Sequence, residues 1–262
     1  LPHVPDWIFT LLGAVGGDAE GKIVRALCRA RGISARFVTE RERPTSLKTR
    51  AVARRHQILR VDRESTHAIS SKTEKKLLRI IRALPAQDMV IVSDYAKGVL
   101  TRTIVKMLVR RFGGRRMIGG LKPSTAGLYR GFSVLVLNLR EAAELTEIHA
   151  KMNEDATRLV RRLGKKMRAS IVLTRGEHGM TVYDATRRNI LHVRSQALNI
   201  FDVTGAGDTV IAVLGLMRAG GSGLFTAANI ANHAAGVVVG KEGTETASPK
   251  ELIRHIVLNE GN

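Results

Sequence analysis

The sequence is poor in cysteine, aromatic residues and acidic residues, and each shortage excludes a class of protein. A single cysteine, Cys28, among 262 residues excludes an internal disulfide and a zinc site built from several cysteines. Aromatic residues make up 4% of the chain, which leaves few rings on which bases could stack. No run approaches the roughly 18 uninterrupted apolar residues of a membrane-spanning helix, so we expect no membrane association. What is present, 44% hydrophobic residues, predicts a globular chain with a sizeable core.

The scarcity of acidic residues gives the chain an unusual charge. Its 43 Lys and Arg against 23 Asp and Glu leave a formal net charge of +20, a balance often associated with nucleic-acid binding. However, the cations alternate with apolar residues at helical spacing within residues 101–112 and 157–168. The cations are Arg102, Lys106, Arg110, Arg158, Arg161, Arg162 and Lys165, and the apolar residues are Ile104, Leu108, Phe112, Leu159, Leu163 and Met167. We therefore expect solvated helix faces and no nucleic-acid partner, with a polyanion-binding face as the alternative.

Strand-like and helix-like segments alternate along the chain. This alternation predicts an α/β fold with a mostly parallel sheet that helices cover on both faces. The expected strands are Phe9–Gly13, Ser34–Thr39, Thr49–Ala53, Gln57–Val61, Met89–Ser93, Arg116–Gly119, Ser133–Leu137, Ser170–Thr174, Met180–Asp184 and Asn189–Val193. The expected helices are Ala19–Gly32, Ser71–Leu84, Thr101–Phe112, Arg140–Glu147, Glu154–Met167, Thr209–Ala219, Leu224–Val239 and Lys250–Leu258.

The organisation of the chain is simple. It contains no internal repeat and no low-complexity linker, so we expect residues 1–262 to form a single domain. The expected strands between residues 34 and 62 lie close together, which predicts a small meander or lid. The run Gly13–Asp18 resembles a phosphate-binding loop but lacks its Gly-Lys-Ser/Thr ending, so we interpret it as a turn between a strand and a helix. His233 lies among small residues, and we expect it to be packed rather than catalytic.

The most informative segment is the string Asp202-Val203-Thr204-Gly205-Ala206-Gly207-Asp208, which precedes an apolar helix. Glycines allow a sharp turn and a close approach of a ligand, and amides at a helix N-terminus favour an anion. A carboxylate at Asp208 would repel a phosphate that is merely held there. It suits the acceptance of a proton from an attacking hydroxyl while the amides stabilise a transferred phosphoryl group. A glycine turn with the aspartate as a helix cap explains the composition equally well.

Two other segments follow expected strands. Leu173–Met180 places two glycines in a turn, which suits either a wall of a nucleotide site or an ordinary hairpin loop. Asn138-Leu139-Arg140-Glu141 lies at a strand-to-helix junction, where an amide and a carboxylate could meet Mg²⁺-bound water or phosphate. A capping box formed by Asn138 and Glu141 explains the same residues without a ligand, and taken alone this structural interpretation is favoured.

Together and in this order, the segments resemble the ribokinase-like (PfkB) carbohydrate kinase family, which carries a DTxGAGD-type string near its C-terminus. Within that family the sequence resembles the kinase domain of bacterial bifunctional heptose-7-phosphate kinase/heptose-1-phosphate adenylyltransferases. The matching segments are Ser93–Gly98, Asn138–Glu141, Leu173–Arg175, Gly179-Met180, Asp202–Ile211, Ala234–Lys241 and Gly243-Thr244. Pro44, Thr45, Lys48, Arg50, Arg60 and Asp62 resemble the lid strands near the sugar, and the resemblance extends from about Leu11 to Pro249.

The resemblance implies a ribokinase-like three-layer sandwich with a small β lid. It implies transfer of the γ-phosphoryl group of ATP to the anomeric hydroxyl of heptose 7-phosphate, in the cytoplasm, for ADP-heptose and lipopolysaccharide core synthesis. ATP, Mg²⁺ and a homodimer follow from it as well. The implied roles are Asp208 as the base; Gly205, Ala206 and Gly207 as the anion hole; Asn138, Leu139, Arg140, Glu141, Thr174, Gly176, Gly179 and Asn232 for ATP; Glu141 for Mg²⁺; and Lys48, Arg50 and Lys97 for the phosphate of the acceptor.

The sequence departs from the family's pattern in several places. The family's first strand and its Gly-Gly-Ala-Ala-Asn loop, which holds the sugar, are missing, and by resemblance about sixty residues would precede Leu1. Gly119-Gly120-Leu121-Lys122 replaces Ile-Asp-Pro-Lys, Leu137 replaces a proline, and no His-x-Gly-His string of an adenylyltransferase is present. These departures leave three alternatives open: an inactive truncated kinase, another PfkB-type sugar kinase, or a module that binds a nucleotide or a polyanion without catalysis.

Overall fold

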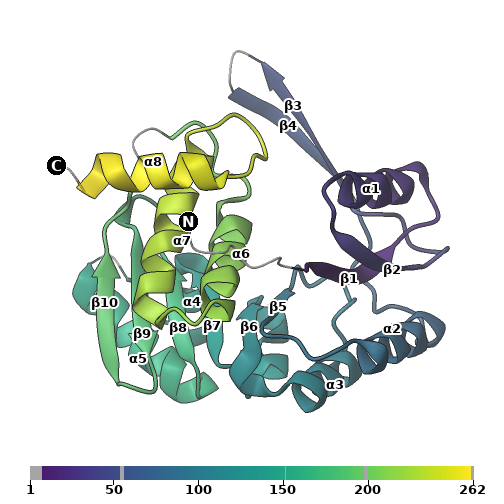
Figure 1. The fold of residues 1–262 in the computed structure, drawn as a ribbon, viewed down its shortest axis with the longest axis horizontal. Helices are drawn as coiled ribbons and strands as arrows, with labels where there is room; N and C mark the ends of the chain where they lie inside the picture. Colours follow the sequence, from purple (N-terminus) through teal and green to yellow (C-terminus); the bar gives the residue numbers. More distant parts are fainter. Residues whose placement is uncertain (1–7, 54–55, 151, 198–199, 261–262) are drawn as a thin grey trace. The chain divides into compact units, whose positions relative to one another are not determined.

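The computed structural model describes residues 8–53, 56–150, 152–197 and 200–260. The chain divides into two units, one formed by Leu1–Pro85 and Ala96–Arg111 and the other by Ala86–Tyr95 and Phe112–Asn262. Figure 1 labels the helices and strands of both units.

A six-stranded sheet forms the centre of the larger unit (Figure 1). Its order is β10-β9-β8-β7-β6-β5; β5 to β8 are parallel, and β9 is antiparallel to both of its neighbours. The strands are β5 (Val90–Ser93), β6 (Met117–Gly120), β7 (Val134–Asn138), β8 (Ser170–Thr174), β9 (Met180–Asp184) and β10 (Asn189–Val193). Strands β7 and β8 are buried over almost their whole length, as their continuous apolar runs require. The predicted mostly parallel sheet is confirmed.

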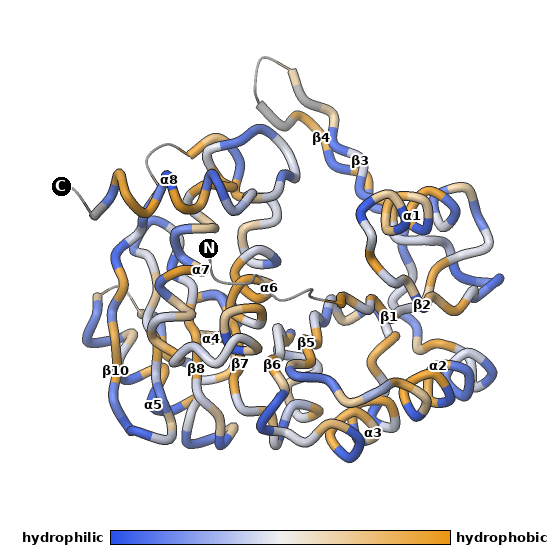
Figure 2. Tube along the Cα trace, in the orientation of Figure 1, coloured by the Kyte–Doolittle hydropathy of each residue, from blue (hydrophilic) through white to orange (hydrophobic). Residues whose placement is uncertain are grey.

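Helices cover both faces of this sheet (Figure 1). On one face lie α6 (Ala206–Ala219) and α7 (Leu224–Val239), on the other α4 (Leu139–Thr146) and α5 (Asn153–Met167), while α8 (Pro249–Glu260) packs on α7. Helices α6 and α7 are hydrophobic on most sides (Figure 2), because they pack on the sheet and on each other. Their packing is close: a Cβ on Gly215 of α6 would lie 2.4 Å from the side chain of Ile91 in β5.

Alternation along the strands divides the core of this unit into two layers. Ile118 of β6 and Val172 of β8 belong to the cluster that includes Leu214 of α6 and Ala231 of α7. The residues next to them in the strands are also buried, with Met117, Ile171 and Leu173 fully inaccessible, as is Leu135 between Val134 and Val136 of β7. Alternation directs these side chains to the opposite face, which α4 and α5 cover. The sheet is therefore the middle of three layers.

The smaller unit contains two separate two-stranded sheets. Strand β1 (Thr10–Val15) pairs in parallel with β2 (Ser34–Thr39), and α1 (Ala19–Ala30) connects them. Strands β3 (Leu47–Ala53) and β4 (His56–Arg63) form an antiparallel ribbon, and α2 (Ser71–Ala83) and α3 (Arg102–Phe112) follow later in the chain. The sequence predicted one meander from residue 34 to 62. In the structure residues 34–39 pair with β1 instead, because a helical connection returns the chain in the parallel direction.

The basic helix faces are exposed to solvent. In α3, Ile104 and Leu108 are buried whereas the three predicted cations are exposed, and α5 buries Leu159 and Leu163 while it exposes its cations. Both helices therefore show blue and orange turns in Figure 2, as expected of amphipathic helices at a protein surface. None of the helices in the described ranges has the length and apolar character needed to cross a membrane.

Candidate active site

The candidate site lies at the edge of the six-stranded sheet where its parallel strands end. Strands β5 to β8 end at Ser93, Gly120, Asn138 and Thr174, which the registers place at one edge. Ligands of open α/β sheets bind at the carboxyl ends of the strands. The predicted nucleotide segments Asn138–Glu141 and Thr174–Gly179 both start at this edge. Tyr95 and Lys122 each follow the end of a strand there by two residues. The fold thus brings most of the predicted nucleotide-side residues to one edge.

The string Asp202–Asp208 forms the turn that leads into α6. Gly205 has a φ of 85°, in the left-handed region that favours glycine, and its carbonyl accepts the Thr209 N–H at 2.9 Å. Gly207 lies in the first helical turn, where a Cβ would meet no atom within 4 Å. The backbone at Gly207 is therefore open to a ligand, beside the partial positive charge of a helix N-terminus. This geometry is compatible with the anion hole predicted at Gly205, Ala206 and Gly207.

Asp208, the predicted base, has a partner that the sequence did not predict. The hydroxyl of Tyr95, just after β5, donates a hydrogen bond to Asp208 Oδ1 at 2.5 Å. Partial burial of the phenol, together with this hydrogen bond and the negative charge of Asp208, raises the pKa of Tyr95 well above its usual range. The phenol therefore stays protonated at neutral pH and acts as a donor.

Asn138 and Glu141 form a capping box at the start of α4. The Glu141 N–H donates to Asn138 Oδ1 at 2.9 Å, and the Asn138 N–H donates to Glu141 Oε2 at 3.0 Å. The other oxygen of Glu141 accepts a hydrogen bond from Lys122 Nζ in an ion pair. The structural interpretation of these residues is therefore correct, and it does not exclude a ligand at the helix N-terminus.

Glu141, the predicted Mg²⁺ ligand, already has protein partners in this arrangement. Both of its carboxylate oxygens are engaged, one by Lys122 and one by the backbone of Asn138. Within the described part of the chain, no group of three or more His, Cys, Asp or Glu side chains is placed to hold a metal ion. Mg²⁺ is usually held by one or two carboxylates together with water and phosphate oxygens, so the Mg²⁺ role of Glu141 stays a prediction.

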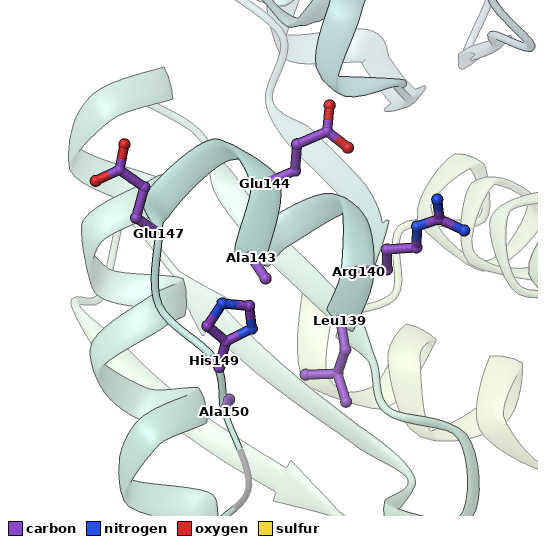
Figure 3. Close-up of a pocket in the computed structure, with 7 residues that line it drawn as sticks. All are labelled: Leu139, Arg140, Ala143, Glu144, Glu147, His149 and Ala150. Atoms are coloured by element: carbon purple, nitrogen blue, oxygen red, sulfur yellow. The ribbon is translucent and has the colours of Figure 1, made fainter.

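Leu139 and Arg140 follow Asn138 in the first turn of α4. Together with Ala143, Glu144, Glu147, His149 and Ala150 they line a surface hollow of about 610 Å³ beside α4 (Figure 3). Figure 3 shows the side chain of Leu139 and the ring of His149 directed toward the space between α4 and the loop that follows it. The four consecutive residues predicted for ATP thus divide into a structural pair and a pair that borders this hollow.

The turn between β8 and β9 contains the other predicted nucleotide residues. Thr174 Oγ1 donates to the Leu137 carbonyl at 3.3 Å, and both Gly176 and Gly179 have a positive φ. A Cβ on Gly179 would lie 2.1 Å from the Val193 carbonyl oxygen, so close backbone packing requires this glycine. A Cβ on Gly176 would meet nothing within 4 Å. Gly176 is therefore the position in this turn at which the backbone is open to a ligand.

Asn232 and His233 are buried in α7. The side-chain amide of Asn232 donates to the Arg194 carbonyl at 2.6 Å and ties α7 to the end of β10. The ring of His233 lies 5.4 Å from that of His255 in α8, in an edge-to-face arrangement. His233 is packed, as predicted, and the contact of Asn232 is structural; its role toward a nucleotide stays a prediction.

Lys48, Arg50 and Lys97, the residues predicted to bind the phosphate of the acceptor, all belong to the smaller unit. Lys48 Nζ lies 3.0 Å from Asp62 Oδ2 and 3.1 Å from Glu64 Oε2, and Lys97 pairs with the other oxygen of Glu64. The hydrogen bond to Asp62 is the main cause that raises the pKa of Lys48, and Lys97 is the main cause that lowers the pKa of Glu64. The structure thus joins two of the three predicted cations through Glu64.

Two residues of this cluster were missed by the sequence analysis. Glu64 follows Asp62 by two positions, and that spacing places both on one face of an extended segment. Arg43 is buried and donates to the carbonyls of Ser65 at 3.1 Å, Lys97 at 2.6 Å and His67. It therefore fixes the backbone that carries Lys97. No local pattern marks Arg43, because its partners lie 22 to 54 residues away.

The turn after β1 is structural, as predicted. Asp18 caps α1 by accepting the Gly21 N–H at 3.0 Å, and it also accepts the Thr45 N–H at 2.8 Å and the Thr45 hydroxyl at 2.6 Å. These hydrogen bonds, the Thr45 hydroxyl foremost, lower the pKa of Asp18 from 3.8 to about 2. A Cβ on Gly16 would lie 2.7 Å from the Thr45 nitrogen. The glycines of this turn make room for the chain before β3.

Comparison with known proteins identifies the family of the chain. The model of the pfkB family carbohydrate kinases matches residues 9–251. The bifunctional protein HldE of Geobacter sulfurreducens is 38% identical over 258 residues, which cover 96% of this chain and 52% of that protein. HldE of Geotalea uraniireducens is 39% identical, over 92% of this chain and 50% of its own length. The chain therefore spans about half the length of the curated relatives it matches.

Solved structures confirm the fold. Phosphofructokinase-2 from Escherichia coli, in complex with potassium, superposes with a TM-score of 0.81 at 14% identity, over 97% of this chain and 83% of that one. Ribokinase from Giardia lamblia superposes with a TM-score of 0.77 at 18% identity, over 95% and 82% of the two chains. The predicted ribokinase-like α/β architecture is correct.

Proposed function

The chain belongs to the pfkB family of carbohydrate kinases, and from this premise we propose that it uses ATP to phosphorylate the anomeric hydroxyl of heptose 7-phosphate. The product would be heptose 1,7-bisphosphate, on the route to ADP-heptose and the lipopolysaccharide core, in the cytoplasm. The heptose rests on the sequence resemblance and on the relatives named HldE. We take the whole chain as one kinase domain.

The observation that carries the proposal is the position of Asp208 in the first turn of α6. One oxygen of its carboxylate is held by Tyr95, while the backbone at Gly207 beside it is open. In the proposed reaction Asp208 accepts the proton of the anomeric hydroxyl as that oxygen forms a bond to the γ-phosphorus of ATP. The bond between the γ-phosphorus and the bridging oxygen breaks, and ADP leaves with that electron pair. The amides of Gly205, Ala206 and Gly207 stabilise the charge of the transferred group.

Lys48, Arg50 and Lys97 of the smaller unit are proposed to bind the phosphate that the acceptor already carries. Lys48 and Lys97 present ammonium groups on two sides of Glu64, and Arg50 lies on the same strand as Lys48. A phosphate has to compete with Asp62 and Glu64 for these cations. Such competition favours a doubly charged phosphate over a neutral hydroxyl, which fits an acceptor that is already phosphorylated.

The nucleotide would lie along the edge where β7 and β8 end. Asn138–Glu141, Thr174, Gly176, Gly179 and Asn232 are proposed to line it, with the open backbone at Gly176 as its closest approach. Glu141 is proposed to meet Mg²⁺ or its bound water beside its contacts with Lys122 and Asn138.

The test is a direct comparison of acceptors with the purified chain. ADP release would be measured with heptose 7-phosphate, fructose 6-phosphate and ribose, and ³¹P NMR would identify the phosphorylated hydroxyl. We expect the highest kcat/KM for heptose 7-phosphate and a new anomeric phosphate signal. Preference for either of the other sugars would identify another PfkB-type kinase. ATP binding without ADP release from any sugar would contradict the proposed activity of this chain.

We also propose that the chain forms a homodimer through the β3–β4 ribbon. Its residues Ile58, Leu59 and Val61 are 70%, 55% and 55% exposed, an unusual amount of aliphatic surface for so small an element. A second copy of the same ribbon would cover it.

A further inference from the structure

We propose that Tyr95 is a positioning residue for phosphoryl transfer, which holds Asp208 by one carboxylate oxygen, and that Lys122 and Glu141 in turn hold Tyr95. This inference rests on the proposed function of Asp208 as the base. It names the residues that orient the carboxylate of Asp208.

The hydrogen bond from Tyr95 gives the two carboxylate oxygens of Asp208 different roles. Because the phenol donates to Oδ1 at 2.5 Å, that oxygen is occupied and the carboxylate loses freedom to rotate. The second oxygen is then the one that accepts a proton from the sugar hydroxyl. A base that is already oriented needs less reorganisation at the moment of transfer.

Tyr95 is itself held from the neighbouring strand. Lys122 Nζ lies 5.9 Å from the centroid of the Tyr95 ring, within the range of a cation–π interaction. The same ammonium group pairs with Glu141, whose second oxygen accepts the Asn138 N–H of the capping box. These contacts form a continuous series from the start of α4 to the start of α6. Glu141 pairs with Lys122, Lys122 contacts the ring of Tyr95, and Tyr95 donates to Asp208.

The placement of the series in the fold supports a role at the site. Tyr95, Lys122 and Glu141 follow the ends of three adjacent parallel strands, β5, β6 and β7. Tyr95 and Asp208 are 113 residues apart in the sequence, so the contact exists only in the folded chain. Tyr95 is 48% exposed, so the ring is not simply a member of the core.

The test compares point variants with the parent kinase. Tyr95→Phe keeps the ring and removes only the hydroxyl, and we expect kcat to fall about 10- to 100-fold, the range for a lost hydrogen bond to a charged group. We expect KM for ATP and for heptose 7-phosphate to stay within about threefold, because neither substrate loses a contact. Tyr183→Phe in β9 is the matched control and should retain the parent rate.

Lys122→Met tests the outer part of the series. It should lower kcat less than Tyr95→Phe does, and the double variant should be no slower than Tyr95→Phe alone, because Lys122 acts through Tyr95. Additive losses would show that Lys122 acts independently and would overturn that part of the inference.

The outcomes separate this inference from the proposed function. If the parent shows no turnover, or if Asp208→Asn is as fast as the parent, the function of Asp208 is wrong. If Asp208→Asn is slow while Tyr95→Phe equals the parent, Asp208 stands and the role of Tyr95 is overturned. A loss in Tyr95→Phe that falls entirely on KM, with kcat unchanged, would also overturn it. Thermal melting of each variant establishes that the fold is retained.

Discussion

Asp208 and Gly207 lie in the same turn of α6, but we expect substitutions at the two positions to have different effects. Asp208→Asn keeps the size of the side chain and removes the proton acceptor, so we expect kcat to fall by about 10²–10⁴. ATP affinity should stay the same or increase, because a negative charge near the γ-phosphate disappears. Steady-state kinetics and nucleotide titration measure both quantities. More than about a tenth of the parent rate in this variant would mean that Asp208 is not the base and that the proton of the hydroxyl goes elsewhere.

Gly207→Val is the matched comparison in the same turn. A Cβ there meets no atom of the protein, so the chain should fold, but the side chain would fill the space by which a ligand reaches the amides. We expect both ATP affinity and kcat to fall. If Asp208→Asn and Gly207→Val lowered only the melting temperature, the string would be a structural turn and the kinase mechanism would be wrong.

Asp18 gives a pH-dependent prediction for the smaller unit. Its folded pKa of about 2 lies below the ordinary value of 3.8, so its hydrogen bonds stabilise the fold above pH 4 or so and are lost as the pH falls through about 2. Asp18→Asn should therefore lower the melting temperature at neutral pH, and the difference from the parent should shrink between about pH 4 and 2. Melting curves of both proteins across this range provide the check. A difference that stayed constant down to pH 2 would contradict the role of the Asp18 charge.

Local patterns predicted some residues well and could not predict others. The capping box of Asn138 and Glu141 is visible in the sequence because its members are three residues apart. The contacts Tyr95–Asp208 and Lys122–Glu141 depend on which strands become neighbours, and no local pattern records that. Glu64 could have been found, because it lies just beyond β4 and two residues after Asp62, which pairs with Lys48 across the ribbon.

At the scale of elements, periodicity predicted the helices and strands with ends within a few residues of those observed, because it reports which side chains are buried. It predicted pairing less well. Residues 34–39 were assigned to the lid because they are near the ribbon in sequence, but they pair with β1. Which strands pair depends on the connection between them, because a helical crossover brings the next strand back in the parallel direction. The sequence of a single short strand does not reveal its partner.

The ribbon of β3 and β4 yields a prediction at this scale. If its exposed aliphatic face is where two copies meet, Leu59→Lys should convert the homodimer into a monomer, because a charge would be buried at the contact. Ile253→Lys in α8, where the isoleucine is 62% exposed, is the control and should leave the dimer intact. Light scattering after gel filtration measures both masses. A dimer that survives Leu59→Lys would place the interface elsewhere.

At the scale of the whole molecule, the net charge of +20 leads to a prediction about ligand binding. The cations of α3 and α5 project from exposed positions, and those chosen for substitution are Arg102, Lys106, Arg110, Arg158, Arg161 and Arg162. Changing all six to Gln should leave ATP affinity within about twofold, because exposed substitutions away from special features act within about 0.5 kcal/mol. Retention on immobilised DNA at two salt concentrations is the second measurement. A collapse of ATP affinity, or the loss of a salt-dependent DNA retention shown by the parent, would favour the polyanion-binding alternative.

The interleaving of the two units along the chain has a consequence for biosynthesis. Residues 96–111 belong to the smaller unit although they follow β5, which belongs to the larger one. On the ribosome, the smaller unit therefore cannot be completed until α3 has emerged, and β5 is made before any strand with which it pairs. During that interval Val90–Ser93 is an apolar segment without hydrogen-bonding neighbours, a state prone to mispairing. Translation pauses placed after β5 should thus be more harmful to the yield of folded protein than pauses placed after β6.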